Sequence, residues 1–412
     1  MEKKFISNKE FDRSSLPVVR VVDAPCGSGK TTTAIQEINR SNTPVVFCTP
    51  FLSEVTRIGA ECKRVTAIDD TVKSSINKLD IVKELLREGK SVAITHELFK
   101  LFDQECYYSI QEHGYNLYLD EVVTSVTNFG LKTADIQHLL KVGAIDMLDT
   151  REVVWLEKDY DGVFNSLKKA VYSGDVYICN ISDKKQLLVW ELSICKFIFF
   201  RNVTILTYLF EGSELSCFFK INSVPYTLFS MYKNEVVPYN KHLENRENLK
   251  QLINIYEGKA NRNFKGTLSA TYYSNDKNKS DILQIKKNAD SYFKNTVKST
   301  SKNSMWSCYK SNIKQLQSSR CTTKNYIPFN CRATNIYRDK VNLAYLINVY
   351  CEPDILQYFD SYNVTLDQDL YAVSTLIQWI CRSAVRNNKP VNLYLPSDRM
   401  RELLEKFFKY EL

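Results

Sequence analysis

The residues with the clearest chemical potential form the run Ala-Pro-Cys-Gly-Ser-Gly-Lys-Thr at positions 24–31. A mostly apolar run at 16–22 precedes it, and a helix-compatible run at 32–39 follows it. This order of strand, glycine-rich loop and helix is typical of a phosphate-binding loop, because glycines let the backbone approach the anion and N–H groups at the helix start point at it. Ala24 stands where the pattern usually has glycine. A glycine- and serine-containing loop that arose by chance is the alternative.

The loop predicts a site for a nucleoside triphosphate with Mg²⁺. Lys30 would contact the β- and γ-phosphates, and the Thr31 hydroxyl would be a Mg²⁺ ligand. The expected nucleotide-binding residues are Pro25, Cys26, Gly27, Ser28, Gly29, Lys30, Thr31 and Thr32.

Two acidic residues, Asp120 and Glu121, directly follow the apolar run 115–119. Carboxylates at the end of a buried strand are costly unless they bind or react with something, and open α/β sheets bind ligands at that edge. Asp120 would hold Mg²⁺ through water, and Glu121 would orient and deprotonate an attacking water molecule. The alternative is a strand that runs out into a polar loop.

Two further pairs, Thr49-Pro50 and Thr95-His96, also follow expected strands, at 44–48 and 91–94. Each pair could offer a hydroxyl and backbone amides to a phosphodiester backbone. Ordinary helix capping is the alternative.

The second half of the chain contains two features that point to anions. Gln378, Arg382 and Arg386 recur every four residues, so on one helix they would form a ridge whose arginines could stabilise charge on a γ-phosphate. Ordinary surface salt bridges are the alternative for this ridge. Between 274 and 320, many lysines alternate with Tyr292, Phe293, Trp306 and Tyr309. Such a mixture suits single-stranded nucleic acid, but a solvated helix face with Ile282, Leu283 and Ile285 turned inward fits equally well.

Composition sets the protein class and its surroundings. The 412 residues suffice for two domains, and 44% hydrophobic with 25% charged residues is typical of a globular protein. The net charge of +8 favours a polyanionic partner. No run is long enough to span a membrane, and the first residues lack a signal peptide's apolar core. Twelve cysteines without metal-binding spacing predict reduced thiols in a cytoplasmic protein.

Apolar runs that alternate with helical patterns predict parallel strands joined by helices. The helical spacing at 79–87 is one such pattern, and 176–181 could be a fifth strand. A strand is also expected within 197–210, a final strand at 390–396 and a closing helix at 398–410. The expected domains are residues 1–190 and 191–412.

Together, these ordered segments resemble a superfamily 2 helicase core of the DEAD/DEAH-like type found in bacteriophages and mobile elements. Residues 24–31 resemble motif I, Thr49-Pro50-Phe51 motif Ia, Asp120-Glu121 motif II, and 378–386 the Q-x-x-x-R-x-x-x-R form of motif VI. The segments 329–340, 343–348 and 393–399 add to the likeness. Val122-Val123 depart from the usual end of motif II. Ser269-Ala270-Thr271 spells motif III but lies too far from Asp120, so 181–182 is the expected place, and 206–208 is the expected motif IV.

The resemblance implies an α/β fold of two RecA-like parallel-sheet domains, with ATP and nucleic-acid sites at their interface. It implies catalytic roles for Lys30, Glu121, Gln378, Arg382 and Arg386. The implied nucleic-acid-binding residues are Thr49, Pro50, Thr95, His96, Arg332, Thr334 and Asn335.

The predicted function is therefore an ATP-dependent helicase or translocase acting on single-stranded or tailed duplex DNA in phage or plasmid replication or recombination. Replication proteins are possible partners, and the cytoplasm of a bacterial host is the expected location. A nucleotide-switched DNA loader or scaffold that does not separate strands, and an RNA-directed ATPase, are the alternatives.

Overall fold

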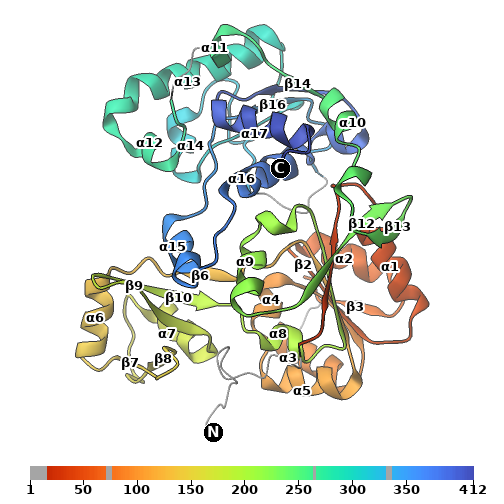
Figure 1. Ribbon diagram of the computed structural model, residues 1–412, viewed down its shortest axis with the longest axis vertical. Helices are drawn as coiled ribbons and strands as arrows, with labels where there is room; N and C mark the ends of the chain where they lie inside the picture. The colour runs from red at the N-terminus through yellow and green to blue at the C-terminus, as the bar shows by residue number, and fades with distance from the viewer. Residues whose placement is uncertain (1–15, 71–76, 263–265, 331–335) are drawn as a thin grey trace. The chain divides into compact units, whose positions relative to one another are not determined.

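The computed structural model describes residues 16–70, 77–262, 266–330 and 336–412. The chain divides into two compact units. The first contains the described residues up to 239, apart from the loop 24–28, together with 352–366. The second contains that loop, 240–351 and 367–412. Each unit is built on its own sheet, and most of the elements are labelled in Figure 1.

The first unit is organised around an eight-stranded sheet in the order β13-β12-β1-β11-β5-β2-β4-β3. Every neighbouring pair is parallel except β12 and β13, which form a hairpin at one edge. The central strands are almost wholly apolar and buried, as strands covered on both faces must be. The strands are β1 (Val19–Asp23), β2 (Val45–Thr49), β3 (Val65–Ala67), β4 (Ser91–Thr95), β5 (Asn116–Asp120), β11 (Asn202–Thr207), β12 (Tyr226–Tyr232) and β13 (Glu235–Pro238).

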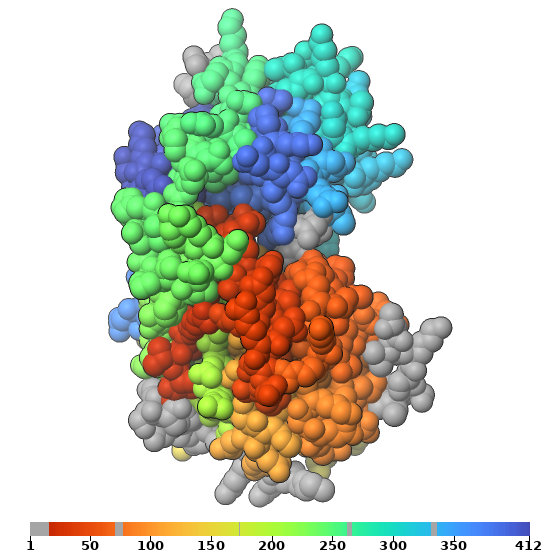
Figure 2. All heavy atoms as spheres, turned by 90° about the vertical axis from the view of Figure 1, so that its right-hand side faces the viewer, coloured from red at the N-terminus to blue at the C-terminus, as the bar shows by residue number. Residues whose placement is uncertain are grey.

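Helices connect these strands. In α2 the apolar residues Val55 and Ile58 are fully buried, and the helix packs on β2, β3 and β4. The segments that contain α1 and α2, red and orange in Figure 2, form a continuous surface of this unit. The helices are α1 (Lys30–Arg40), α2 (Leu52–Glu61), α3 (Lys78–Arg87), α4 (His96–Lys100), α5 (Gln104–His113), α8 (Cys195–Ile198) and α9 (Glu214–Ile221).

A separate small core is inserted between β5 and β11. It consists of a three-stranded antiparallel sheet in the order β6-β10-β9 and a β7–β8 hairpin, with α6 and α7 packed against them. Its elements are β6 (Val126–Asn128), α6 (Thr133–Lys141), β7 (Ile145–Met147), β8 (Val153–Trp155), α7 (Asn165–Ser173), β9 (Val176–Ser182) and β10 (Lys185–Glu191).

The helix α15 (Pro353–Ser361) packs on β6 and β9 of this inserted part, although its neighbours in sequence belong to the second unit. Asp354 accepts hydrogen bonds from Lys185 Nζ at 2.6 Å and from Asn128 Nδ2 at 2.8 Å. Ile355, Tyr358 and Phe359 of α15 are buried. The chain thus leaves the second unit, contributes one helix to the first and returns.

The second unit contains a four-stranded parallel sheet in the order β14-β17-β16-β15. Its strands are β14 (Ile253–Ile255), β15 (Ser304–Ser307), β16 (Asn342–Tyr345) and β17 (Val391–Tyr394). Its helices are α10 (Arg246–Gln251), α11 (Lys259–Arg262), α12 (Ala270–Ser274), α13 (Lys279–Ser291), α14 (Ile313–Leu316), α16 (Gln368–Ile380) and α17 (Asp398–Phe408).

The predicted fold class, α/β with two parallel-sheet domains, is confirmed. The expected domain boundary after residue 190 is wrong, because β11, β12 and β13 complete the sheet of the first unit and carry it to residue 239. The expected strand at 176–181 exists as β9, but it is antiparallel and belongs to the inserted part. β17 and α17 match the last predicted strand and helix.

Candidate nucleotide site

The loop 24–29 joins the carboxyl end of β1 to the first residue of α1, Lys30. Gly27 and Gly29 have φ angles of +83° and +90°, which side chains rarely tolerate, so glycine is needed at both positions. No side chain caps α1, and its first turn contains no acidic residue. The positive end of this helix dipole is therefore not offset by a side chain of the helix itself, as a site for an anion requires.

Asp120, the last residue of β5, contacts the start of α1. The Thr31 hydroxyl donates a hydrogen bond to Asp120 Oδ1 at 3.2 Å. Burial and the neighbouring Glu121 carboxylate raise the pKa of Asp120 to about 7, although the Lys30 ammonium acts in the opposite direction. A buried carboxylate whose charge is this unfavourable is suited to a cation, which would stabilise its ionised form.

The oxygen atoms of Thr31 and Asp120 fit Mg²⁺, which prefers hard oxygen ligands and usually keeps waters and substrate phosphates in its shell. Among the described residues, no cluster of three or more His, Cys, Asp or Glu could hold a metal alone. Two protein oxygen atoms leave places in a Mg²⁺ shell for phosphate oxygens and water.

Glu121 leaves the strand in an unusual backbone conformation. Its φ angle of +68° lies in the left-handed region, and its N–H donates to Leu206 O on β11 at 2.8 Å. The chain therefore turns sharply at this point, and Glu121 itself is half-buried. Backbone strain of this kind is frequent at functional sites.

Strand β11 lies between β1 and β5, which sequence reasoning did not foresee. Thr207 is paired with Asp23 of β1, while Leu206 is paired with Asp120 of β5. Thr207 is buried at the same sheet edge as the loop. The whole inserted part separates Asp120 from this strand in sequence, which hid the relationship.

Two assignments made from the resemblance change accordingly. Residues 206–208 lie at the end of β11 in the first unit, so they are not a motif of the second domain. Residues 181–182 are the last two residues of β9, an edge strand of the inserted sheet and not of the parallel sheet. Ser269 lies in the second unit, where it caps α12 by accepting a hydrogen bond from Tyr272 N at 3.2 Å.

A buried aspartate that the sequence analysis did not single out orders the same edge. Asp23, the last residue of β1, accepts hydrogen bonds from the N–H groups of Leu209 at 2.6 Å and Phe210 at 2.9 Å. These hydrogen bonds join the turn after β11 to the end of β1, directly before the glycine-rich loop. An acidic residue directly before the Ala-Pro pair was the available signal.

The pairs Thr49-Pro50 and Thr95-His96 lie on adjacent parallel strands, with Thr49 paired to Thr95. The Thr95 hydroxyl accepts a hydrogen bond from Leu98 N at 3.2 Å, so it caps α4, as the alternative reading expected. The Thr49 hydroxyl is buried and does not cap α2, whose first residue follows Phe51. His96 is buried.

In the second unit, Gln378, Arg382 and Arg386 do not form the expected ridge on one helix. The helix α16 ends at Ile380, where the N–H groups of Arg382 and Ser383 bond to carbonyls three residues back. Ser383 is extended and its hydroxyl caps a short 3₁₀ turn, Ala384–Asn387. Gln378 is half-buried, Arg382 is buried and Arg386 is exposed, so the three side chains have different surroundings.

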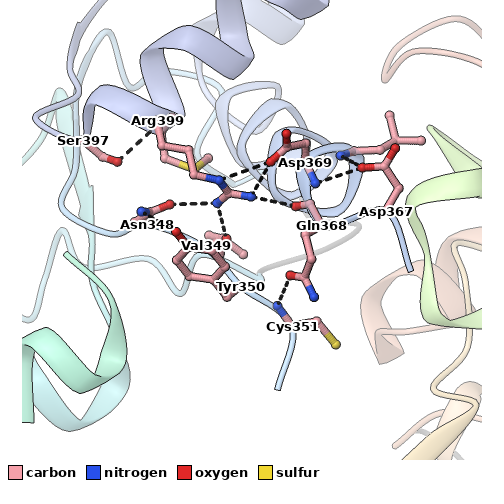
Figure 3. Close-up of polar contacts among 11 residues, drawn as sticks. Asn348, Val349, Tyr350, Cys351, Asp367, Gln368, Asp369, Ser397 and Arg399 are labelled. Atoms are coloured by element: carbon pink, nitrogen blue, oxygen red, sulfur yellow. Dashed lines mark hydrogen bonds and ion pairs between the residues drawn. The ribbon is translucent and has the colours of Figure 1, made fainter. Parts of the chain in front are cut away.

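The start of α16 is held by a polar network centred on Arg399 of α17 (Figure 3). Its guanidinium donates to Asp369 Oδ1 at 2.8 Å, to Gln368 O at 3.0 Å and to Asn348 Oδ1 at 2.9 Å. It also lies 4.4 Å from the centre of the Tyr350 ring. Arg399 thus ties together the two chain segments that lead to and from α15.

Three of the four aromatic residues expected to stack on bases among the lysines of 274–320 are core residues, whereas Tyr309 is half-buried against the same core. Tyr292, Phe293 and Trp306 are at most 2% exposed and belong to one apolar cluster of the second unit. They cannot stack on bases, so the expectation of an aromatic platform is wrong for them. The alternative is right for Ile282 and Ile285, which are buried, whereas Leu283 is 50% exposed.

Arg332, Thr334 and Asn335, expected to bind nucleic acid, lie outside the described residues. In the part of the chain that the structure describes, no helix is both long and apolar enough to cross a membrane.

These features define a class of protein: an α/β fold with a glycine-rich loop beside the hydrogen-bonded hydroxyl of Thr31 and carboxylate of Asp120. Residues 247–408 match the family model described as the YonV C-terminal Rossmann-like domain. Over 410 residues, the chain is 32% identical to the SPbeta prophage-derived uncharacterized protein YonV of Bacillus subtilis (strain 168). The alignment covers 94% of this chain and 97% of that protein. The chain therefore belongs to the YonV family.

The matched domain begins close to residue 240, where the second unit begins. Among solved structures, the chain is similar to S. tokodaii Xpd4, with 12% identity, a TM-score of 0.46, and coverage of 96% of this chain and 95% of that one.

Proposed function

We propose that this protein is an ATP-dependent nucleic-acid helicase or translocase with DNA as its track. The observation that carries the proposal is the hydrogen bond from Thr31 to Asp120, which joins the phosphate-loop helix to the acidic strand end. A lysine and a hydroxyl at the start of α1, beside a buried carboxylate followed by Glu121, form the set that cleavage of a triphosphate needs.

Lys30, Thr31, Asp120, Glu121 and the glycine-rich loop each have a proposed part in hydrolysis. Lys30 would neutralise charge on the β- and γ-phosphates, and the N–H groups of the loop would bind their oxygens. Glu121 would accept a proton from water as the water oxygen bonds to the γ-phosphorus and the bond to the bridging oxygen of ADP breaks. Bound Mg²⁺, held by Thr31 and Asp120, would supply positive charge to the phosphate oxygens.

Other assigned roles rest on the family resemblance. Gln378, Arg382 and Arg386 would stabilise charge that develops on the γ-phosphate. Thr49 and Thr95, paired at the ends of neighbouring strands, would face the phosphodiester backbone together with Pro50 and His96. Arg332, Thr334 and Asn335 would contribute to the same grip on nucleic acid.

The test is ATP hydrolysis by the purified chain, alone and with single-stranded DNA, duplex DNA or RNA, followed by strand separation of a tailed duplex. Stimulation by DNA together with strand separation supports the proposal, and Lys30→Ala should abolish both. Stimulated hydrolysis without strand separation or movement along DNA would favour the nucleotide-switched loader. Stimulation by RNA alone would favour an RNA-directed ATPase, because only RNA carries the 2′-hydroxyl. Absence of Lys30-dependent hydrolysis would overturn the ATPase assignment.

A further inference from the structure

The β12–β13 hairpin lies against the start of the phosphate-loop helix. β12 is parallel to β1 and pairs with it on the side opposite to β11 and β5. The hairpin then turns through two residues, Lys233 and Asn234, between the paired residues Tyr232 and Glu235. Their φ angles of +49° and +64° are those of a tight two-residue hairpin turn, a conformation that asparagine tolerates better than most residues.

Asn234 makes two contacts with the candidate nucleotide site. Its backbone carbonyl accepts a hydrogen bond from the Thr33 hydroxyl at 3.2 Å. Its side-chain Oδ1 lies 3.1 Å from where a Cβ atom on Gly29 would stand, so the side chain of this exposed asparagine lies beside the last glycine of the loop. Thr33 and Asn234 are 201 positions apart in sequence, and only the sheet brings them together.

Residues from both sides of β1 in the sheet therefore contact the start of α1. Asp120 contacts Thr31 from the side of β5, while Asn234 contacts Gly29 and Thr33 from the side of β12. Gly29 has a φ of +90° and its N–H belongs to the group expected to bind phosphate. A neighbour that fixes the Gly29 peptide would fix the direction of that N–H before any ligand arrives, which lowers the cost of ordering the loop on binding.

We infer that Asn234 is a positioning residue for the nucleotide: its side chain holds the end of the phosphate loop in the conformation that presents Gly29 N–H to the triphosphate. This inference rests on the proposed ATP site. Lys233 serves as the contrast within the same turn, because its ammonium lies 5.2 Å from the centre of the Tyr232 ring rather than on the loop. The hairpin would thus contribute to nucleotide affinity through one residue of its tip.

Three variants test this role in the full-length chain. Asn234→Gly removes the side chain yet keeps the backbone carbonyl and suits a positive φ, so the hairpin should persist. Asn234→Asp keeps the shape but places a carboxylate beside the phosphates. Lys233→Asn changes the neighbouring tip residue to one that also suits the turn and is the matched control.

The measurements are KM and kcat for ATP hydrolysis, the Kd for ATP, and the melting temperature of each variant. Asn234→Gly should raise KM and Kd by about tenfold, which corresponds to about 1.4 kcal/mol, with kcat changed less than about twofold. Asn234→Asp should raise them further, and the excess should shrink at high salt because charge repulsion is screened. Lys233→Asn should change KM by less than about twofold, and all three melting temperatures should match the wild type.

The outcomes separate this inference from the function on which it rests. If the wild type binds ATP in a Lys30-dependent way while both Asn234 variants keep its Kd and KM, the positioning role is wrong and the ATP site stands. An equal rise of KM in Lys233→Asn would also overturn it, because the effect would then belong to the turn as a whole. If the wild type binds no ATP, the proposed function itself fails.

Discussion

Replacing Asp120 by asparagine should make the nucleotide-free protein more stable, and increasingly so as the pH rises. The pKa of Asp120 is raised from its usual value of 3.8 to about 7, first by burial and then by the Glu121 carboxylate. The folded state therefore holds a proton that the unfolded chain releases at lower pH. The stability that this proton linkage supplies is complete below the usual pKa and is lost as the pH rises through about 7.

The size of the effect follows from these two pKa values. Between pH 5 and pH 7, the free energy of unfolding of the wild type should fall by about 2 kcal/mol relative to Asp120→Asn. The slope is about 1.4 kcal/mol per pH unit near pH 5 and is halved at the folded-state pKa of about 7. Asparagine has no titrating group, and its side-chain oxygen can still accept the hydrogen bond from Thr31. The difference between the two proteins thus isolates the carboxyl group.

The assay is urea unfolding of both proteins at several pH values from 5 to 8, without nucleotide or divalent cation. Asp103→Asn is a control of opposite sign. Burial acts to raise the pKa of Asp103, but its salt bridge to Lys83 at 2.6 Å and its hydrogen bonds from Cys106 together outweigh burial and lower the pKa. Asp103→Asn should therefore destabilise the protein by a nearly constant amount over this pH range. If the free energies of unfolding of the wild type and Asp120→Asn change in parallel with pH, the raised pKa of the buried Asp120 carboxylate is refuted.

Three further outcomes are expected. Cys26 is the one cysteine of the described residues that is not buried. In a Cys331→Ser background, Mg²⁺ with ATP should slow the alkylation of Cys26, whereas adenosine should not. Equal alkylation rates would place the nucleotide elsewhere. Arg246→Met should destabilise the second unit by about 3–5 kcal/mol in thermal or urea unfolding, because it removes the cation of the buried 2.7 Å ion pair with Glu244. Lys250→Ala, which removes the cation of the exposed 3.8 Å pair with Glu405, should cost less than about 1 kcal/mol. Asp354→Ala should speed amide hydrogen exchange in α15 and β6, because it removes the hydrogen bonds that join this helix to the inserted sheet, and unchanged exchange would show that apolar packing alone holds the helix.

The glycine-rich loop between strand and helix and the acidic end of the Asp120 strand could be predicted because each is a local pattern. An apolar strand followed by glycines and Lys30, or by two acids, is complete within about ten residues, and the parallel sheet then brings the two ends together. The contact between Thr31 and Asp120 supports that reasoning. The alternation of strands and helices that defines the fold class is also visible in the sequence.

The features that sequence reasoning missed depend on residues far apart in the chain. Nothing local shows that β11 runs between β1 and β5, because the whole inserted part intervenes. The four-residue spacing from Gln378 to Arg386 suggested one helix, but the extended backbone at Ser383 ends the pattern. Trp306 has the residue type for base stacking, yet its burial is decided by the packing of several elements of the second unit.

Binding of ATP by the full-length protein, measured calorimetrically with and without Mg²⁺, tests the central claim most directly. We predict saturable binding at one site, tighter with Mg²⁺ than without it, and lost in Lys30→Ala at unchanged melting temperature. Asp120→Asn should lose the Mg²⁺-dependent part of the affinity. Binding that is indifferent to Lys30, or no binding by the wild type, would contradict the assignment of residues 24–31 and Asp120 as a nucleotide site.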